Sequence, residues 1–151
     1  MSDRLRPPVT RIATGSSEDS AAHRLCVLTV EDDLSARWLM RSALKNACDF
    51  LSATTGEEAL ELYRRHQPQV VILDFCLPNK RGDDILKDLL DADPAAYVVV
   101  MSGSENMEAL QAMLAAGACA MLVKPFEKAD LLRAVLGPRE RGVSSLPKNE
   151  F

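Results

Sequence analysis

The sequence predicts an α/β domain built on a five-stranded parallel sheet. Short apolar runs alternate five times with longer stretches in which apolar residues recur at helical spacing. The runs are continuous, which is typical of strands buried on both faces. A chain that repeats strand and helix in this way forms a parallel sheet covered by helices on both sides and joined by right-handed crossovers.

The five expected strands follow directly from these apolar runs. The first run is Leu-Cys-Val-Leu-Thr-Val, the third contains Val-Val-Ile-Leu and the fourth contains Val-Val-Val-Met. The second and fifth runs are shorter. The expected strands span residues 25–30, 50–53, 69–74, 97–102 and 119–123.

Five helices are expected after these strands. In the first, apolar residues such as Leu34 and Trp38 recur at helical spacing, and the second has acidic residues in its first turn, where the helix dipole favours them. The third should end before Pro94, because the residue before a proline avoids helical geometry. Gly117 is a natural stop for the fourth. The expected helices span residues 34–47, 56–63, 82–90, 105–115 and 127–136.

The folded domain is expected at residues 24–136, with a flexible tail on each side. Residues 1–23 and 137–151 contain Pro, Gly, Ser and mixed charges without apolar periodicity. The N-terminus lacks the apolar segment of a signal peptide, and no apolar run approaches the roughly 20 residues that span a bilayer. We therefore expect a soluble, cytoplasmic protein.

Charge and cysteine content narrow the function classes. The net charge of −4 argues against broad binding to nucleic acid, which needs a basic face. The four cysteines, at positions 26, 48, 76 and 119, form no Cys-x-x-Cys pair and have no histidine near them in sequence. Structural zinc sites need clustered ligands, so these thiols are interpreted as small buried apolar groups in a reducing cytosol.

Reactive side chains follow four of the expected strands. Glu31 and Asp32 follow the first, Asp74 ends the third, Ser102 ends the fourth and Lys124 follows the fifth. In parallel sheets the functional crevice lies beyond the carboxyl ends of the strands, so these side chains should converge. Three neighbouring carboxylates repel one another, and a hard cation such as Mg²⁺, which prefers oxygen ligands, removes the conflict.

The remaining strand-end groups suggest phosphoryl transfer. Lys124 and a bound cation would supply the positive charge that phosphoryl oxygens require, and Ser102 can donate a hydrogen bond to one of them. Asp74 would then be the nucleophile, giving an aspartyl phosphate. Each residue also has an ordinary interpretation: an acidic residue after a strand is often a helix N-cap, which we favour for Asp33. Their joint occurrence at four strand ends favours the functional interpretation.

Taken together, these motifs show that the sequence resembles the response-regulator receiver family, which is CheY-like with flavodoxin-like topology. The resemblance covers about residues 24–136. It rests on Val-Leu-Thr-Val-Glu-Asp-Asp at 27–33, Ala-Thr-Thr-Gly-Glu-Glu-Ala-Leu at 53–60, Val-Ile-Leu-Asp-Phe-Cys-Leu-Pro at 71–78 followed by Gly82, Met-Ser-Gly at 101–103 and Val-Lys-Pro-Phe at 123–126. It implies a doubly wound sheet in the order 2-1-3-4-5 with five helices.

The resemblance also implies roles for the site residues. Glu31 and Asp32 would hold Mg²⁺ together with Asp74 and the backbone carbonyl of Cys76. Asp74 would accept the phosphoryl group. Ser102 would be the switch hydroxyl, and Lys124 would pair with the phosphoryl group, with a cis peptide bond before Pro125.

Two positions depart from the family pattern. Receivers usually carry Tyr or Phe three residues before the lysine, where this chain has Met121, and often Asp at the position of Ala120. A flexible methionine could still repack. Cys76 and Ser104 stand where the resemblance puts the residues that govern the lifetime of the phosphoryl group.

These observations favour a single-domain response regulator of a two-component phosphorelay, phosphorylated by a sensor histidine kinase or a histidine phosphotransfer protein. It would catalyse only its own phosphorylation and dephosphorylation. It would signal by protein contact, through the face formed by the fourth helix, fifth strand and fifth helix, or by onward phosphotransfer. The segment after Leu136 is too short for a DNA-binding unit, although the chain could equally be cut from a longer protein. The alternatives are a phosphorylation-independent binding module and an aspartyl-phosphate hydrolase, which would need a second carboxylate two residues after Asp74.

Overall fold

The structure is a computed structural model that describes residues 24–78 and 80–141. The tail expected at 1–23, and residues 142–151 of the tail expected at 137–151, lie outside the described residues. The strands are β2 (Leu25–Val30), β3 (Cys48–Ala53), β4 (Val70–Asp74), β5 (Val98–Gly103) and β6 (Ala120–Lys124). The helices are α2 (Leu34–Leu44), α3 (Gly56–His66), α4 (Gly82–Ala92), the 3-10 turn η2 (Ser104–Asn106), α5 (Met107–Ala116) and α6 (Lys128–Arg141).

The five strands form one parallel sheet in the order β3-β2-β4-β5-β6. In the order of the expected strands this is 2-1-3-4-5, so the predicted flavodoxin-like topology is confirmed. The order reverses at β2, whose neighbours are β3 and β4. In such sheets the carboxyl ends of the strands at the reversal are the usual place for a functional site.

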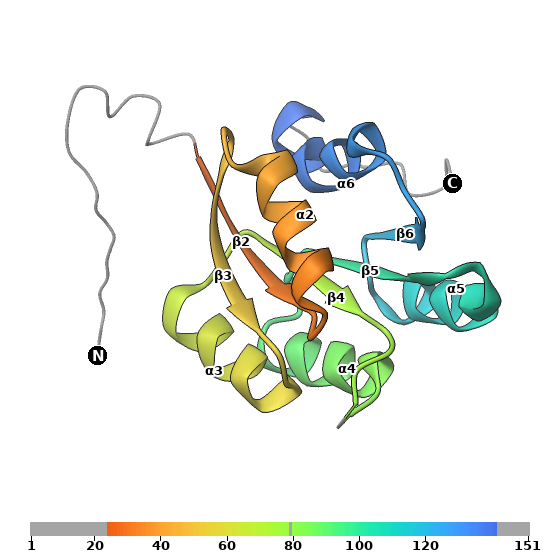
Figure 1. The fold of residues 1–151 in the computed structure, drawn as a ribbon. Coiled ribbons are helices and arrows are strands. Elements are labelled where there is room, and N and C mark those ends of the chain that lie inside the picture. The colour runs from red at the N-terminus through yellow and green to blue at the C-terminus, as the bar shows by residue number, and fades with distance from the viewer. Residues whose placement is uncertain (1–23, 79, 142–151) are drawn as a thin grey trace.

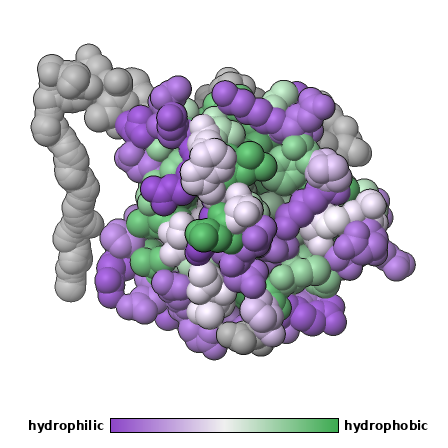
Figure 2. Space-filling view, viewed as in Figure 1, coloured by the Kyte–Doolittle hydropathy of each residue, from purple (hydrophilic) through white to green (hydrophobic). Residues whose placement is uncertain are grey.

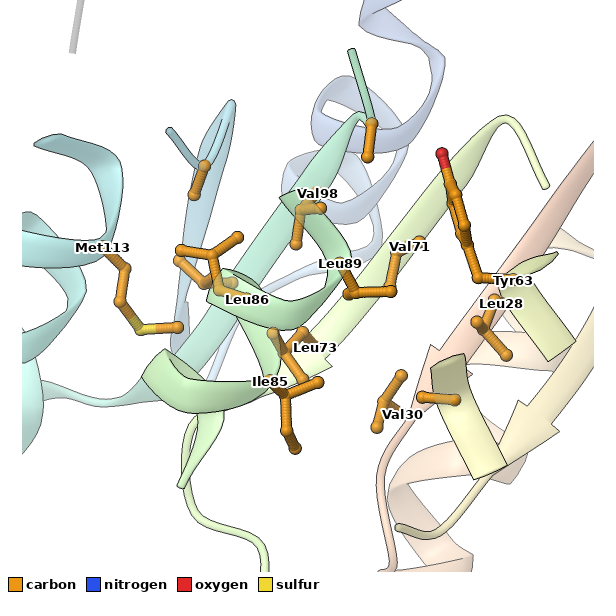
Figure 3. Close-up of a cluster of buried hydrophobic side chains, with 14 of the residues drawn as sticks. Leu28, Val30, Tyr63, Val71, Leu73, Ile85, Leu86, Leu89, Val98 and Met113 are labelled. Carbon is orange, nitrogen blue, oxygen red and sulfur yellow. The ribbon is translucent and has the colours of Figure 1, made fainter. Parts of the chain in front are cut away.

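Helices cover both faces of the sheet, as the alternating pattern predicted (Figure 1). One core cluster joins α3, α4 and α5 to the sheet; Leu28, Leu73 and Val100 contribute from the strands. Figure 3 shows this cluster, with Leu86 and Leu89 of α4 turned onto the strands. A second cluster joins α2 and α6 to the other face, and its strand members include Val27 and Ile72. Successive strand residues therefore serve opposite layers, which explains why the strands are apolar throughout.

Most element boundaries lie within three residues of the sequence prediction, and the C-terminal helix differs most. Residues 137–141, expected to belong to a tail, continue α6 to Arg141. Pro138 has no N–H to donate to the carbonyl of Ala134. The hydroxyl of Tyr97 donates to that carbonyl instead, at 2.9 Å. A tertiary contact thus satisfies the group that the proline leaves unpaired.

The first helix also ends earlier than expected, at Leu44. The guanidinium of Arg24 donates to the carbonyls of Lys45 and Asn46, at 3.1 and 3.3 Å, and to that of Cys48 at 2.7 Å. The first two of these bonds satisfy carbonyls just past the end of the helix, where intrahelical partners are lacking. They turn the chain directly into β3, which begins two residues earlier than predicted.

The surface over α2 and α6 mixes polar residues with smaller apolar areas (Figure 2). Three large apolar side chains are exposed on α2: Leu34, Trp38 and Leu39 are 70%, 66% and 55% exposed.

Within residues 24–78 and 80–141, none of the helices combines the length and apolar content needed to cross a membrane.

Candidate functional site

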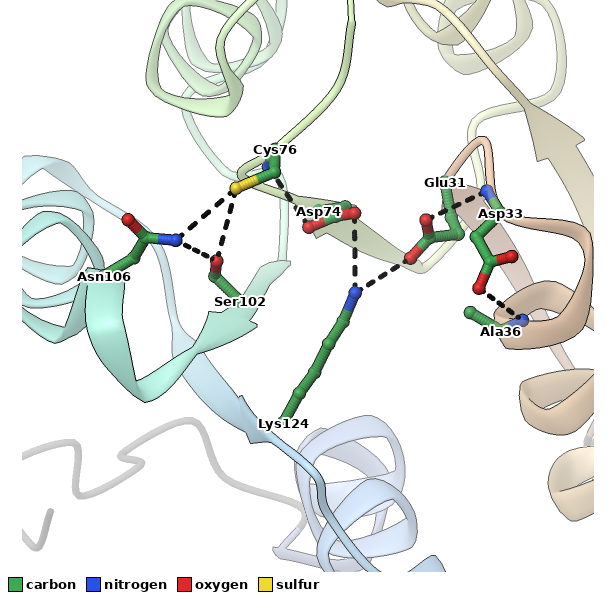
Figure 4. A network of polar contacts seen from close by, with 8 residues as sticks. All are labelled: Glu31, Asp33, Ala36, Asp74, Cys76, Ser102, Asn106 and Lys124. Carbon is green, nitrogen blue, oxygen red and sulfur yellow. Dashed lines mark hydrogen bonds and ion pairs between the residues drawn. The ribbon is translucent and has the colours of Figure 1, made fainter.

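Four strand ends meet at one edge of the sheet, where they carry a cluster of charged and polar side chains (Figure 4). β2, β4, β5 and β6 are adjacent in the sheet order. Asp74 is the last residue of β4 and lies beside Met101, while Lys124 is the last residue of β6 and lies beside Gly103. The structure therefore brings together groups that are as much as 93 residues apart in the sequence.

Three carboxylates form the acidic part of the cluster. Glu31, Asp32 and Asp74 each place one oxygen within 4.8 Å of the others. Glu31 and Asp74 are buried, at 1% and 4% exposure, whereas Asp32 is exposed. The pKa of Glu31 is raised to about 6, mainly by burial and also by the nearby Asp74, against the lowering effects of the Asp33 N–H and of Lys124. The protein therefore holds negative charge here at an electrostatic cost.

Lys124 supplies the positive charge in the cluster. Its Nζ lies 3.3 Å from Oε1 of Glu31 and 3.5 Å from Oδ2 of Asp74. Burial lowers the pKa of Lys124, but Asp74 and Glu31 raise it by more, so that it stands above its ordinary value. Lys124 is thus charged at neutral pH and bridges the two buried carboxylates.

Asp32 and Asp33 have separate roles although they are neighbours. The carboxylate of Asp33 is the N-cap of α2 and accepts a hydrogen bond from the N–H of Ala36 at 3.3 Å, as the sequence suggested. Its own N–H donates to Oε2 of Glu31 at 3.1 Å. Asp33 therefore orients Glu31 through its backbone, while Asp32 joins the acidic cluster through its side chain.

The loop after β4 holds Asp74 in place through its backbone. The N–H of Cys76 donates to Oδ1 of Asp74 at 3.2 Å. The N–H of Gly82 donates to the carbonyl of Phe75 at 3.0 Å, and a Cβ at position 82 would lie 2.6 Å from Cα of Phe75. Only glycine allows this approach, so α4 begins directly against the segment that carries Asp74. The Lys124–Pro125 peptide, directly after β6, is cis, as the resemblance implied.

Ser102 is buried in β5, and its hydroxyl lies in a triangle of polar groups. Nδ2 of Asn106 donates to Oγ of Ser102 at 2.7 Å and to Sγ of Cys76 at 3.4 Å, and that sulfur lies 3.6 Å from Oγ of Ser102. Sequence reasoning missed Asn106. The feature of the sequence that could have indicated Asn106 is a side-chain amide four residues after the serine at the end of the strand. Cys76, expected to be buried, is exposed at this edge.

The other positions singled out in the sequence lie around the cluster. Ser104 is exposed and begins η2. Met121 is half-buried and packs against the same core cluster as Leu110 and Met113 of α5. Both of these α5 side chains are buried and belong to the core.

The donor set suits a magnesium ion. If all four groups are charged, three carboxylates and one ammonium leave a net charge of −2 on the cluster. Carboxylate oxygens are the ligands that Mg²⁺ prefers in proteins, and a few of them suffice because this ion keeps several waters. Glu31, Asp32 and Asp74 are therefore the residues that could hold it.

This fold, with an acidic cluster and a lysine at the carboxyl edge of the sheet, defines a class of signalling domain rather than a single protein. The family profile described as response regulator receiver domain matches residues 27–136. The chain therefore belongs to the response regulator receiver family of two-component systems.

Relatives of known sequence agree with this assignment. Protein CcdB of Bacillus subtilis is 33% identical over 111 residues, which cover 72% of this chain and 92% of that protein. The chemotaxis protein CheY of Thermotoga maritima is 30% identical over 111 residues, with the same shares covered.

Solved structures show the same fold. The receiver domain of the Francisella response regulator 1452 is 26% identical, with a TM-score of 0.72, and the match covers 80% of this chain and all of that one. The DrrB receiver domain, described as BeF₃-activated, is 25% identical with a TM-score of 0.69, covering 78% and 99%. NtrX of Brucella abortus is 25% identical with a TM-score of 0.71, but the chain spans 28% of its length.

Proposed function

We propose that this receiver accepts a phosphoryl group on Asp74 in a Mg²⁺-dependent reaction and signals by protein contact or onward phosphotransfer. The observation that carries the proposal is the placement of Asp74. Its buried carboxylate lies 3.5 Å from the Lys124 ammonium and within 4.8 Å of two further carboxylates. The domain would catalyse only its own phosphorylation and dephosphorylation.

The proposed chemistry is a single displacement at phosphorus. A carboxylate oxygen of Asp74 forms the new P–O bond while the P–N bond of a phosphohistidine breaks, and the electron pair leaves with the imidazole nitrogen. Lys124 would neutralise a phosphoryl oxygen, and Ser102 would donate its hydroxyl proton to another. Held by Glu31, Asp32, Asp74 and the Cys76 carbonyl, Mg²⁺ would supply the remaining positive charge.

A protein is the expected phosphodonor, a sensor histidine kinase or a histidine phosphotransfer protein, in the cytoplasm expected from the sequence. The surface of α2 supports a protein partner, because Leu34, Trp38 and Leu39 are exposed on the helix that begins directly after the acidic cluster. Exposed apolar residues that gather on one element mark interaction sites more often than scattered ones do. The downstream partner is proposed to contact α5, β6 and α6.

The decisive experiment is intact mass spectrometry after incubation with acetyl phosphate and Mg²⁺. We expect wild type to gain one phosphoryl group, and the Asp74→Asn variant to gain none. Asp91→Asn is the matched control, because Asp91 is exposed on α4 and pairs with Lys87 at the surface. Phosphorylation of the Asp74→Asn variant to the wild-type level would exclude Asp74 as the acceptor.

The same experiment separates the two alternatives. A phosphorylation-independent binding module would show no mass gain in wild type. An aspartyl-phosphate hydrolase would release phosphate with little accumulation of the phosphorylated form, whereas a receiver would accumulate that form and release phosphate only as fast as it decays. Phosphate release measured beside the mass therefore distinguishes all three functions.

The lifetime of the phosphoryl group is proposed to depend on Cys76 and Ser104. Cys76 is exposed directly beside Asp74, and Ser104 begins the turn that follows Ser102. Neither side chain is a carboxylate or an amide that could orient an attacking water. Their joint replacement should change the rate of dephosphorylation more than the rate of phosphorylation, and an unchanged decay rate would refute this assignment.

A further inference from the structure

Asn106 occupies an unusual position between the switch hydroxyl and a helix. It is the last residue of η2 and stands at the N-cap position of α5, yet its side chain makes no capping hydrogen bond. Asparagine is among the best N-cap residues because its side-chain oxygen accepts from the first turn. Here the side chain instead turns its amide group toward Ser102 and Cys76 (Figure 4).

The contact with Ser102 is short and one-directional. Nδ2 of Asn106 donates to Oγ of Ser102 at 2.7 Å, so the hydroxyl acts as the acceptor. A hydroxyl has one proton to donate and two lone pairs that accept. Accepting from Asn106 therefore leaves the Ser102 proton available for a phosphoryl oxygen on Asp74. The two hydrogen bonds are compatible, and Asn106 can remain attached when Ser102 turns toward the phosphoryl group.

The same amide also reaches the loop after the neighbouring strand, β4. Its second hydrogen bond, to Sγ of Cys76 at 3.4 Å, ties α5 to the loop that follows Asp74. Asn106 thus links the start of α5 to the loop that follows Asp74, through Cys76, and to the neighbouring strand β5, through Ser102. α5 in turn packs Leu110 and Met113 into the core cluster that also contacts Met121.

We propose that Asn106 is the positioning residue that couples the Ser102 hydroxyl to α5 in this receiver. The inference rests on the proposed function. When the Ser102 proton turns to a phosphoryl oxygen, the Asn106 amide follows the hydroxyl and shifts the first turn of α5. The side chains of Met113, on α5, and of Met121, on β6, then repack against each other's surroundings, because methionine side chains are flexible. This contact provides a route from the site to the α5 surface that needs no aromatic side chain at position 121.

The test is nuclear magnetic resonance of the full chain with and without Mg²⁺ and beryllofluoride, a phosphoryl mimic. In wild type we expect backbone amide shifts at Asp74, Ser102 and through α5 as far as Met113, together with a shift of the two Nδ2 protons of Asn106. In Asn106→Ala, beryllofluoride should still bind and shift Asp74 and Ser102, while the response at Met113 is lost.

Two further variants separate coupling from simple damage. Gln111→Ala, which removes an exposed amide from the same helix, should respond as wild type does. Asn106→Asp retains the size of the side chain, but its carboxylate can only accept hydrogen bonds. It would therefore accept a hydrogen bond from the Ser102 hydroxyl, which then no longer points to the phosphoryl mimic, and it would add a negative charge. Beryllofluoride affinity should therefore fall in Asn106→Asp and stay near wild type in Asn106→Ala. A general loss of structure would not separate the two replacements in this way.

The possible failures are distinguishable. If wild type shows no response at Asp74, the proposed function fails and the coupling fails with it. If wild type responds at Asp74 and Ser102, but Asn106→Ala retains the full response at Met113, only the coupling is wrong. An unmoved Asn106 side-chain signal in wild type would overturn it equally.

Discussion

Replacing Asp32 with asparagine should stabilise the metal-free protein and remove its response to Mg²⁺. Asp32 lies within 4.8 Å of two other carboxylates. At that separation a pair of unit charges repels by about 0.9 kcal/mol in a medium like water, and by about 3.5 kcal/mol at an effective dielectric constant of about 20. Asp32 is exposed, so the lower value applies, and two neighbours give about 2 kcal/mol in total.

A smaller effect opposes this gain. A carboxylate near the start of a helix is stabilised by about 0.3–1 kcal/mol through the helix dipole, and Asp32 precedes the N-cap of α2 by one residue. The net gain in unfolding free energy is therefore about 1 kcal/mol, or a melting temperature higher by about 4 °C. The measurement belongs at low salt with a chelator and near pH 8, because the pKa of Glu31 is raised to about 6.

Asp33→Asn is the matched control, since it removes the same charge one residue further along. Asparagine caps a helix about as well as aspartate, and the Asp33 carboxylate bonds the N–H of Ala36 rather than joining the cluster. We expect its metal-free melting temperature to be unchanged or slightly lower.

Excess Mg²⁺ should reverse the ranking of the variants. Free ion at about a hundred times its dissociation constant stabilises a folded protein by about 2.7 kcal/mol. Wild type and Asp33→Asn should gain this, while Asp32→Asn gains little because it lacks a ligand. A lower metal-free melting temperature in Asp32→Asn, together with a full response to Mg²⁺, would refute the placement of this charge.

Three further experiments test the scaffold of the domain. Gly82→Ala should cost about 1–3 kcal/mol of stability, since the added Cβ would lie 2.6 Å from Cα of Phe75; an unchanged thermal unfolding curve would contradict the close approach. Tyr97→Phe should cost about 1 kcal/mol by leaving the carbonyl of Ala134 unpaired, and amide exchange should rise mainly at the end of α6. The pKa of Cys26 is raised to about 11, mainly by burial and also by the neighbouring Asp49 and Cys48, so at pH 8 its thiolate fraction is about a hundredfold below that of an ordinary thiol. Iodoacetamide should label it at least about tenfold more slowly in the folded than in the urea-unfolded protein, and equal rates would show that the thiol is not protected.

The sheet could be predicted from the sequence because its strands are buried on both faces. A residue such as Ile72 is apolar to fill one layer and its neighbour Leu73 to fill the other. The resulting continuous run is distinctive even in a single sequence. The ends of the helices were harder to predict from the sequence, because they depend on contacts between residues that are distant in the chain. No local pattern shows that Tyr97 satisfies the carbonyl left by Pro138, or that Arg24 closes α2.

The site divides in the same way. The convergence of Glu31, Asp74 and Lys124 could be predicted because parallel strands bring their carboxyl ends to one edge. Backbone topology alone fixes that proximity. Asn106 could not be found in this way, since its contact with Ser102 depends on how a short 3-10 turn orients one side chain.

The charges of the cluster explain why metal and phosphoryl group should depend on one another. Three carboxylates and Lys124 sum to −2. On the proposed function, acylation removes the charge of Asp74 and adds about −2 on the phosphoryl group, so the cluster would reach about −3 without a metal. With a divalent cation present the same change runs from 0 to about −1. A buried site tolerates the change in net charge with the cation far better than the change without it, because uncompensated charge is costly in a buried site. Phosphorylation should therefore require that the cation bind first, and Lys124 alone should not replace it.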